Sequence, residues 1–462
     1  MLTQLSVHHL RNLQTVHIKV GQCNVFVGAN GSGKTSLLES LYLLSRGKSF
    51  RHHQPKRYIS HHASHTTVYA KFTNGSSMAI QKAQDASSIM RLDQQTVYVQ
   101  SALTKQLPTL LIDPSSMDIL EIGSGSRRQL LDWITFHVKP GFHSQWLSYQ
   151  RLLKQRNALL KQSSRLSQSQ LQELAAWDKG LANHAALITH YRQQAFEEWQ
   201  PLFNDLINQL LPDYAPFIQL RFSAGYNTDI ALDELLQQRL TQDCQMGYTR
   251  IGCHRADVQV LWVDDAEARL QSIERSKQLS NNEAFSGSEQ PIAISSDATP
   301  FNLEDEQAFE NDLIDFEQEE DTVIGNFREQ AANVLSRGEK KLLITALRLS
   351  QLPLLAVSKL AESKLAASKL AEFEGVGVAE VNDKPSGLGD ENELLPLVLL
   401  DDISAELDDR AIDILLKLLS QLSCQVFITS LDQEIIDKIK PYWPQAKLFH
   451  MKHGTVTESS VV

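Results

Sequence analysis

The sequence contains few cysteines and only short apolar runs, and both absences narrow the class of protein. The 462 residues include four cysteines, and none of them belongs to a C-x-x-C pair. A disulfide framework or a thiolate metal site needs more cysteines at closer spacing, so we expect reduced thiols and a cytoplasmic location. Apolar runs are short, as at 397–400, and the first residues lack the apolar region of a signal peptide. We therefore expect no membrane-spanning segment.

Acidic side chains outnumber basic ones, but the excess comes from one segment. The formal net charge is −11, and residues 281–325 contain 13 Asp or Glu and no Lys or Arg. The rest of the chain has 44 basic against 42 acidic side chains. The overall acidity therefore does not exclude a nucleic-acid partner.

One short glycine-rich motif carries most of the functional signal. It follows the pattern G-x-x-x-x-G-K-[ST] and consists of Gly28, Ala29, Asn30, Gly31, Ser32, Gly33, Lys34 and Thr35. An apolar run precedes it and leucines at helical spacing follow it, as in the strand–loop–helix context of a P-loop. The glycines let backbone N–H groups turn toward phosphate oxygens, which predicts ATP binding. We expect Lys34 to reach the β- and γ-phosphates as a catalytic residue, and the Thr35 hydroxyl to bind Mg²⁺.

A second candidate motif lies at 335–341 and opens a helical pattern. Ser336 and Glu339 have the S-x-x-E spacing of a capping box, so Ser336 is expected to be the helix N-cap. The letters Leu-Ser-x-Gly also resemble the signature motif of ABC-type ATPases. Because a helix N-terminus can bind an anion, we assign Ser336, Arg337 and Gly338 to the γ-phosphate of a nucleotide. A well-capped helix without this role is the alternative.

Two carboxylates follow the apolar run at 397–400. Asp401 is placed to hold Mg²⁺ as a Walker B residue, and Asp402 to orient the attacking water as the catalytic base. An ordinary strand end is the alternative. The segment 404–409 then occupies the position of a D-loop, and 425–430 has the composition of a buried strand. This order of motifs matches the ABC ATPase head, in which two chains are thought to sandwich two ATP molecules.

The pattern along the chain predicts an α/β fold. We expect an ABC-type P-loop ATPase head, with mixed sheets and flanking helices, and an inserted α-helical side lobe or arm. Strands are expected at 16–20, 66–72 and 94–100, long helices over 136–211, and strand-like segments over 217–263. The expected segments are 1–135 (head with the P-loop), 136–215 (arm), 216–274 (head strands), 275–326 (disordered acidic insert), 327–354 (signature helix region), 355–393 (low-complexity insert) and 394–462 (Walker B, D-loop and end of the head).

Nearly the whole chain outside the two inserts resembles the RecF family of bacterial recombination mediators. The matching stretches are LRN (10–12), GKSFR (47–51), RRQLLDW (127–133), FH (136–137), LKQRN (153–157), GCHRAD (252–257), LSRG (335–338), LDD (400–402) and SAELD (404–408). Cys253 stands where the family usually has proline. Asp402 stands where fast ABC ATPases have glutamate, and its shorter side chain predicts slow turnover.

The resemblance implies an ABC/SMC-like head that forms an ATP-dependent homodimer on DNA and hydrolyses ATP slowly. It also implies cooperation with RecO and RecR in directing RecA to single-stranded gaps, hence a role in replication-linked repair and the SOS response. Sequence-neutral contact with the DNA backbone suits this role. Candidate DNA contacts are Arg127, Arg128, Arg151, Lys154 and Arg156, although a solvated helix face is the simpler interpretation of the arm charges.

Two other functions and the role of one residue pair stay open. A soluble P-loop enzyme, such as a kinase, would need the P-loop and Asp401 but not the motif at 335–338. An ABC subunit of a membrane transporter would need a compact head without the arm at 136–211. His254 and Arg255 either couple the nucleotide state to the arm or take part in a plain buried ion pair. The four tryptophans of the 133–199 region are expected to pack in the core and the lobe rather than stack on bases.

Overall fold

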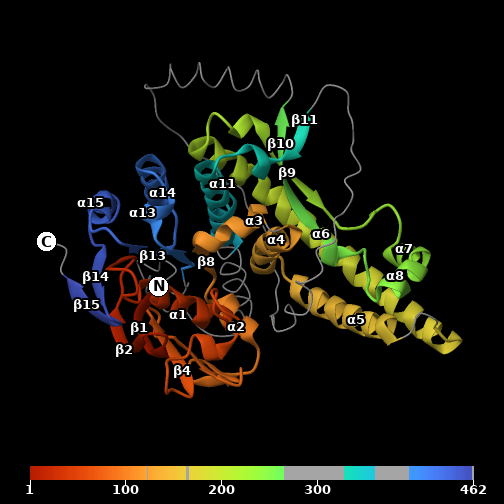
Figure 1. The fold of residues 1–462 in the computed structure, drawn as a ribbon, viewed down its shortest axis with the longest axis horizontal. Helices are drawn as coiled ribbons and strands as arrows, with labels where there is room; N and C mark the ends of the chain where they lie inside the picture. The colour runs from red at the N-terminus through yellow and green to blue at the C-terminus, as the bar shows by residue number, and fades with distance from the viewer. Residues whose placement is uncertain (122, 163–165, 265–326, 359–394, 460–462) are drawn as a thin grey trace, which may run out of the picture. The chain divides into compact units, whose positions relative to one another are not determined.

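The computed structural model describes residues 1–121, 123–162, 166–264, 327–358 and 395–459. The described chain divides into two compact units, Met1–Ser116 with Ser363–Val462 (unit 1) and Met117–Glu362 (unit 2). Figure 1 follows the chain through both units. The predicted acidic insert at 275–326 and most of the predicted insert at 355–393 lie outside the described residues.

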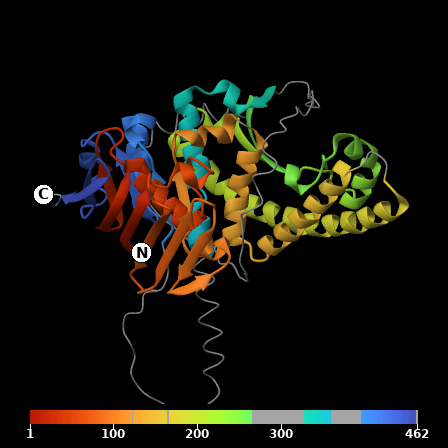
Figure 2. The same ribbon diagram turned by 60° about the horizontal axis from the view of Figure 1, so that its bottom comes forward.

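Unit 1 begins with an antiparallel sheet whose strand order is β2-β1-β4-β5-β6-β7. Its strands are β1 (Leu2–Leu10), β2 (Leu13–Lys19), β4 (His65–Phe72), β5 (Ser77–Ala83), β6 (Ser88–Leu92) and β7 (Gln95–Val97). Figure 2 shows these strands as a row of red and orange arrows. Buried side chains alternate with more exposed ones along β4 and from Val16 onward in β2, which confirms the strands expected at 16–20 and 66–72. The strand expected at 94–100 is shorter, because helix α2 (Gln100–Gln106) begins at its end.

The second sheet of unit 1 has the order β15-β14-β3-β13-β12-β8, and only β15 runs antiparallel to its neighbour. Its strands are β3 (Cys23–Val27), β8 (Thr109–Ile112), β12 (Leu397–Leu400), β13 (Gln425–Ser430), β14 (Lys447–Lys452) and β15 (Thr455–Ser459). Every residue of β3, β12 and β13 is buried, as expected for parallel strands covered on both faces. The strands predicted at 397–400 and 425–430 are confirmed.

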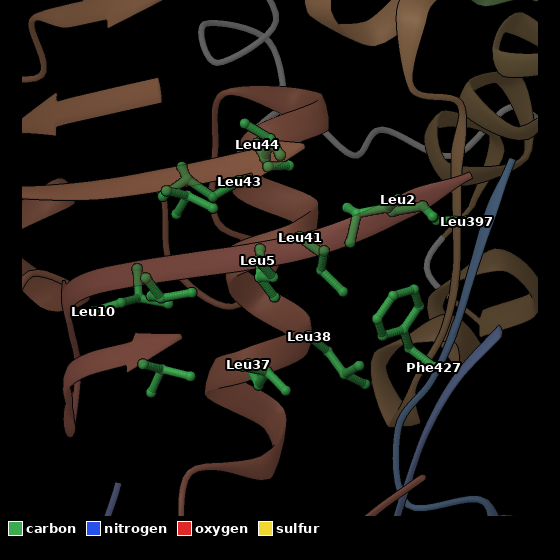
Figure 3. Close-up of a cluster of buried hydrophobic side chains, with 14 of the residues drawn as sticks. Leu2, Leu5, Leu10, Leu37, Leu38, Leu41, Leu43, Leu44, Leu397 and Phe427 are labelled. Carbon is green, nitrogen blue, oxygen red and sulfur yellow. The ribbon is translucent and has the colours of Figure 1, made fainter. Parts of the chain in front are cut away.

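Helix α1 (Lys34–Arg46) is the centre of the unit 1 core. Ten of its residues are buried, and its leucines belong to one apolar cluster with residues of both sheets. Figure 3 shows Leu37, Leu38 and Leu41 of α1 among Leu5 of β1 and Phe427 of β13. Burying a leucine side chain contributes roughly 1.5–3 kcal/mol. The cluster therefore holds the first turn of α1 in a fixed place. Unit 1 also contains α13 (Ile403–Glu406), α14 (Asp409–Gln421) and α15 (Ile435–Ile439).

Unit 2 is mainly helical. Its helices are α3 (Asp118–Glu121), α4 (Ser124–Val138), α5 (Phe142–Gln162), α6 (Gln168–Leu210), α7 (Leu232–Gln238), α8 (Leu240–Met246), α10 (Ala331–Val334) and α11 (Arg337–Leu349). The sheet β11-β10-β9 combines Phe327–Gln330, Asp257–Asp264 and Ile218–Ser223. Figures 1 and 2 show α5 and α6 side by side, which confirms the helices expected over 136–211. The strand-like pattern expected over 217–263 is wrong between β9 and β10. There Leu232 and Leu236 recur at helical spacing and pack α7 on the arm core.

Two expectations about side chains can be compared directly with the structure. The four cysteines are free thiols, as expected. Trp133, Trp146 and Trp199 are buried, and Trp177 packs against a smaller apolar cluster of the arm, so the expected packing role of the tryptophans is confirmed.

One apolar helix of unit 2 does not overturn the expectation of no membrane-spanning segment. By length and composition alone, the 22-residue helix Arg337–Ser358 passes the criteria for a membrane span, with a window of mean hydropathy 1.3. However, 61% of that window is buried inside the structure. Its apolar side chains are therefore used in packing.

Candidate functional site

The predicted P-loop joins the end of β3 to the start of α1. Gly33 has φ 111°, a backbone angle that favours glycine, and no side chain of the described residues caps the N-terminus of α1. The Lys34 side chain is buried, and its Nζ donates to the carbonyl oxygens of Gly28 at 2.6 Å and Ala29 at 3.2 Å. Burial lowers the pKa of Lys34, while the nearby charges of Asp402 and Asp401 oppose that shift.

Two other segments hold the P-loop in shape. A Cβ at position 28 would lie 2.4 Å from the backbone oxygen of Met451, so the hairpin β14–β15 leaves room only for glycine there. Asn12 lies in the turn between β1 and β2, where its Nδ2 donates to the Gly31 oxygen at 3.0 Å and its Oδ1 accepts from Ser36 Oγ at 3.2 Å. Asn12 belongs to a stretch that matches the family, but the sequence alone did not indicate this contact.

A buried carboxylate ties the start of the chain to α1. Glu39 is fully buried, and Arg11 donates to both of its oxygens. Ser49 also donates to Glu39. The matching stretches LRN and GKSFR therefore meet at one residue of the P-loop helix, which the sequence alone did not indicate.

Asp401 lies beside the hydroxyl of Thr35 at the carboxyl edge of the parallel sheet. Thr35 Oγ1 donates to Asp401 Oδ1 at 3.0 Å, and Thr429 Oγ1 donates to the same oxygen at 2.8 Å. Asp113, which follows β8, lies near enough to act on Asp401 through its charge. Burial raises the pKa of Asp401, and the two threonine hydrogen bonds oppose that shift. Asp113 was not predicted as a site residue, although a carboxylate directly after an apolar strand is a signal that the sequence contains.

Asp402 has a strained backbone next to this cluster. Its φ of 53° and ψ of 51° lie in the left-handed region, which costs a non-glycine residue on the order of 1 kcal/mol. Its backbone N–H donates to Thr429 Oγ1 at 2.8 Å. The buried Asp402 Oδ1 has no hydrogen-bond partner among the described residues. A carboxylate oxygen held in this way is available to a bound water or ligand.

The residues present fit a nucleotide with its metal ion. The buried Ser32 Oγ has no hydrogen-bond partner within the described part of the chain, and the uncapped start of α1 offers backbone N–H groups to an anion. Lys34 supplies a positive charge beside them. Thr35 and Asp401 supply the oxygen donors that Mg²⁺ prefers, already within hydrogen-bond distance of each other. Bound Mg²⁺ would neutralise phosphate charge at this edge of the sheet.

The residues of the predicted signature motif lie in unit 2 at the start of α11. Ser336 is the N-cap, and it forms the predicted capping box with Glu339 through bonds of 2.7 and 3.4 Å. Ser336, Arg337 and Gly338 are exposed. A Cβ at position 338 would meet no atom within 4 Å, so packing in the described structure does not require glycine there. The roles assigned to these three residues stay predictions.

Three of the five basic residues suggested as DNA contacts bond to other residues of unit 2. Arg156 is fully buried and donates to Asp178 at 2.7 Å and to Asp243 and Thr249 at 2.8 and 2.7 Å. Arg127 pairs with both oxygens of Asp257 at 2.9 Å. Arg128 donates to the Ala256 oxygen at 3.0 Å. Arg151 and Lys154 are exposed on α5. The suggestion that Arg156 contacts DNA is therefore wrong.

His254 belongs to the same buried polar network of the arm. Its Nδ1 lies 2.7 Å from the Tyr149 hydroxyl, and its Nε2 lies 3.2 Å from the Thr249 oxygen. Burial lowers the pKa of His254 to about 3, so the imidazole is neutral near pH 7. These contacts favour a buried polar role over an ion pair with a charged histidine.

The fold and the P-loop define a P-loop ATPase head of the ABC/SMC type with an inserted helical arm, as the sequence predicted. Residues 1–368 match the family model described as RecF/RecN/SMC N terminal domain. The chain belongs to the RecF family.

Individual relatives support this assignment along the full chain. The DNA replication and repair protein RecF of Acinetobacter baumannii is 34% identical over 458 residues, covering 99% of this chain and 98% of that protein. The protein of the same name from Coxiella burnetii is 31% identical over 456 residues, covering 98% of each. A solved structure of the recombination mediator protein RecF with ATP, in the RecFOR pathway, has a TM-score of 0.67 at 19% identity, covering 99% of this chain and 97% of that one.

Proposed function

We propose that this protein binds ATP at the P-loop and acts in DNA replication and repair. The observation that carries the proposal is the convergence of Thr35, Asp401 and the buried Lys34 at one edge of the parallel sheet. Relatives named as DNA replication and repair proteins, and a RecF structure with ATP, support it. The kinase and transporter alternatives lose support because the chain belongs to the RecF family.

The nucleotide works as a switch between two copies of the chain. Lys34 and the P-loop N–H groups bind the phosphates, and Thr35 and Asp401 hold Mg²⁺. Ser336, Arg337 and Gly338 of the second copy bind the γ-phosphate, which joins the two chains. Loss of that phosphate removes the charge that bridges them. The exposure of the start of α11 and the open space around Gly338 support this arrangement.

Asp402 orients the water that attacks the γ-phosphate. Its partnerless buried oxygen supports this role, and its short side chain makes hydrolysis slow. The cycle is therefore a timer for residence on DNA. The biological output of this cycle is that the protein, together with RecO and RecR, directs RecA to gapped DNA. The RecA loaded in this way then induces the SOS response. A cytoplasmic location fits it.

The test is sedimentation velocity of the full chain with ATP, ADP or no nucleotide. We expect a dimer with ATP only, and a monomer for Lys34→Met under all conditions, because the phosphates lose their buried cation. Lys71→Met removes an exposed lysine of β4 as a matched control and should dimerise normally. An ATP-dependent dimer in Lys34→Met would contradict the P-loop assignment.

Asp402→Asn separates binding from hydrolysis in the same assay. We expect this variant to retain the ATP-bound dimer on gapped DNA, with hydrolysis slower by roughly 10²-fold or more. Phosphate release measured alongside sedimentation gives both values. If Asp402→Asn loses ATP binding instead, the role assigned to Asp402 is wrong.

A further inference from the structure

The first 84 residues have a charge opposite to that of the whole chain. They contain ten Lys or Arg, eight His and a single acidic residue, Glu39, in a protein of net charge −11. Glu39 is buried and bonded to Arg11, so this stretch exposes no carboxylate side chain. A strongly one-signed region in an acidic chain indicates an anionic partner.

Three of these ten Lys or Arg and four of the eight His lie in one surface segment of unit 1, residues 51–62, which we call the basic loop. Its exposed basic and imidazole side chains are Arg51, His52, His53, Lys56, Arg57, His61 and His62. No ion pair between described residues involves any of them. Their charges are therefore not neutralised by neighbouring carboxylates, as they would be in a structural cluster.

The backbone of the basic loop is held by hydrogen bonds at both ends. Ser49 Oγ accepts from the backbone N–H groups of Arg51 and His52 at 3.0 and 3.1 Å. At the other end, the Tyr58 oxygen accepts from Arg11 N–H at 2.7 Å, and Ser60 Oγ donates to the Arg11 oxygen at 2.6 Å. Pro55 and Tyr58 are buried between the exposed cations. The basic groups therefore project from a fixed backbone, which reduces the entropy lost on binding.

We propose that the basic loop binds the phosphate backbone of DNA. The proposal rests on the proposed function, and it names the surface that function needs. Three permanent cations, Arg51, Lys56 and Arg57, occur within seven residues and suit contacts with successive phosphates. Imidazole N–H groups beside them add hydrogen-bond donors. Such contacts position the protein on DNA without reading its sequence.

A short series of hydrogen bonds also connects the basic loop to α1, the helix that follows the P-loop. Ser49, which holds the start of the basic loop, and Arg11, which holds its end, both donate to Glu39 of α1. The basic loop therefore has a direct structural connection to the P-loop helix.

The test measures DNA binding by fluorescence anisotropy with a gapped duplex of arbitrary sequence, with ATP, over a series of salt concentrations. The loop variant combines Arg51→Gln, Lys56→Gln and Arg57→Gln. We expect roughly ten-fold or greater loss of affinity at 0.1 M salt. The slope of log K against log salt should become shallower by up to about 3, since each lost phosphate contact removes about 0.9.

A charge-matched control removes three exposed cations of unit 2 by Lys161→Gln, Lys179→Gln and Arg239→Gln. It changes the net charge equally, so we expect a much smaller loss of affinity. Equal losses in both variants would overturn the proposal, because general charge would then explain binding. ATP affinity, measured with a fluorescent ATP analogue, should be unchanged in the loop variant.

Further outcomes keep the two proposals distinguishable. If the wild-type chain binds no DNA, the proposed function fails. If it binds DNA and the loop variant binds equally well, only the loop assignment fails. If the loop variant instead loses binding to anionic phospholipid vesicles while keeping DNA affinity, the surface belongs to a membrane. Should the triple variant fail to bind ATP, the three single substitutions replace it. Each should then reduce the slope by about 1, and unchanged slopes in all three would overturn the proposal.

Discussion

Arg156 of the arm and Arg51 of the basic loop differ in what surrounds their side chains. Arg156 of α5 is fully buried and bonded to two carboxylates and a threonine. Arg51 of the basic loop is exposed, and no described carboxylate pairs with it. Both residues belong to stretches that match the RecF family. Membership in a family motif therefore does not separate a folding role from a binding role, whereas burial and partners do.

The difference has an energetic reason. A guanidinium that is buried without partners loses its hydration and gains no compensating hydrogen bonds. A buried guanidinium is therefore stable only where carboxylates face it. An exposed guanidinium keeps its hydration and can exchange bound counterions for phosphates. Arg156 therefore joins α5, α6 and α8, and the loop arginines remain available to a ligand.

The largest expected difference between the two groups is in stability. Arg156→Met should lower the free energy of unfolding by about 3–5 kcal/mol, because it leaves Asp178 and Asp243 buried without their cation. Urea unfolding followed by circular dichroism measures it. Arg151→Met, an exposed position on the same helix, is the matched control and should change stability by less than about 0.5 kcal/mol. If Arg156→Met lowers the free energy of unfolding by less than about 1 kcal/mol, the folding role assigned to Arg156 is wrong.

A smaller effect should appear in the pH dependence of stability. The pKa of His254 is about 3 in the folded chain, and histidine titrates near 6.5 when unfolded. Between these values the unfolded state binds a proton that the folded state does not. The free energy of unfolding therefore falls as the pH is lowered, by up to about 1.4 kcal/mol per pH unit. In His254→Gln this contribution should disappear.

Urea unfolding at pH 6.5 and pH 5 measures the difference. We expect wild type to lose about 2 kcal/mol more than His254→Gln over this range. His53→Gln, an exposed position in the basic loop, serves as the control and should behave as wild type. Identical pH dependence in wild type and His254→Gln would show that this imidazole does not remain neutral inside the arm.

The smallest expected effect concerns Arg51→Gln. Its free energy of unfolding should stay within about 0.5 kcal/mol of wild type, since the side chain is exposed. Its DNA affinity should fall nonetheless, so one substitution separates binding from stability. Thermal unfolding monitored beside anisotropy gives both numbers. A clear loss of stability would mean that Arg51 helps to hold the fold.

Local patterns predicted the elements with strong periodicity or defined caps. The P-loop between an apolar strand and a leucine-rich helix, and the capping box of Ser336, required only neighbouring residues. The helices at 232–246 were missed because a short apolar pattern does not decide between strand and helix. Asp113 and Asn12 were missed because their neighbours are distant in sequence.

The sequence alone determined the class of nucleotide site, the strands and helices beside it, and the family. These features depend on runs of a few residues, whose apolar periodicity and backbone preferences determine the local structure. Only the tertiary structure decided which side chains meet. Thr35 and Asp401 are 366 residues apart, and Arg127 and Asp257 are 130 apart. Such pairs depend on strand order and helix packing, which place distant residues together and determine which arginines are withdrawn from water.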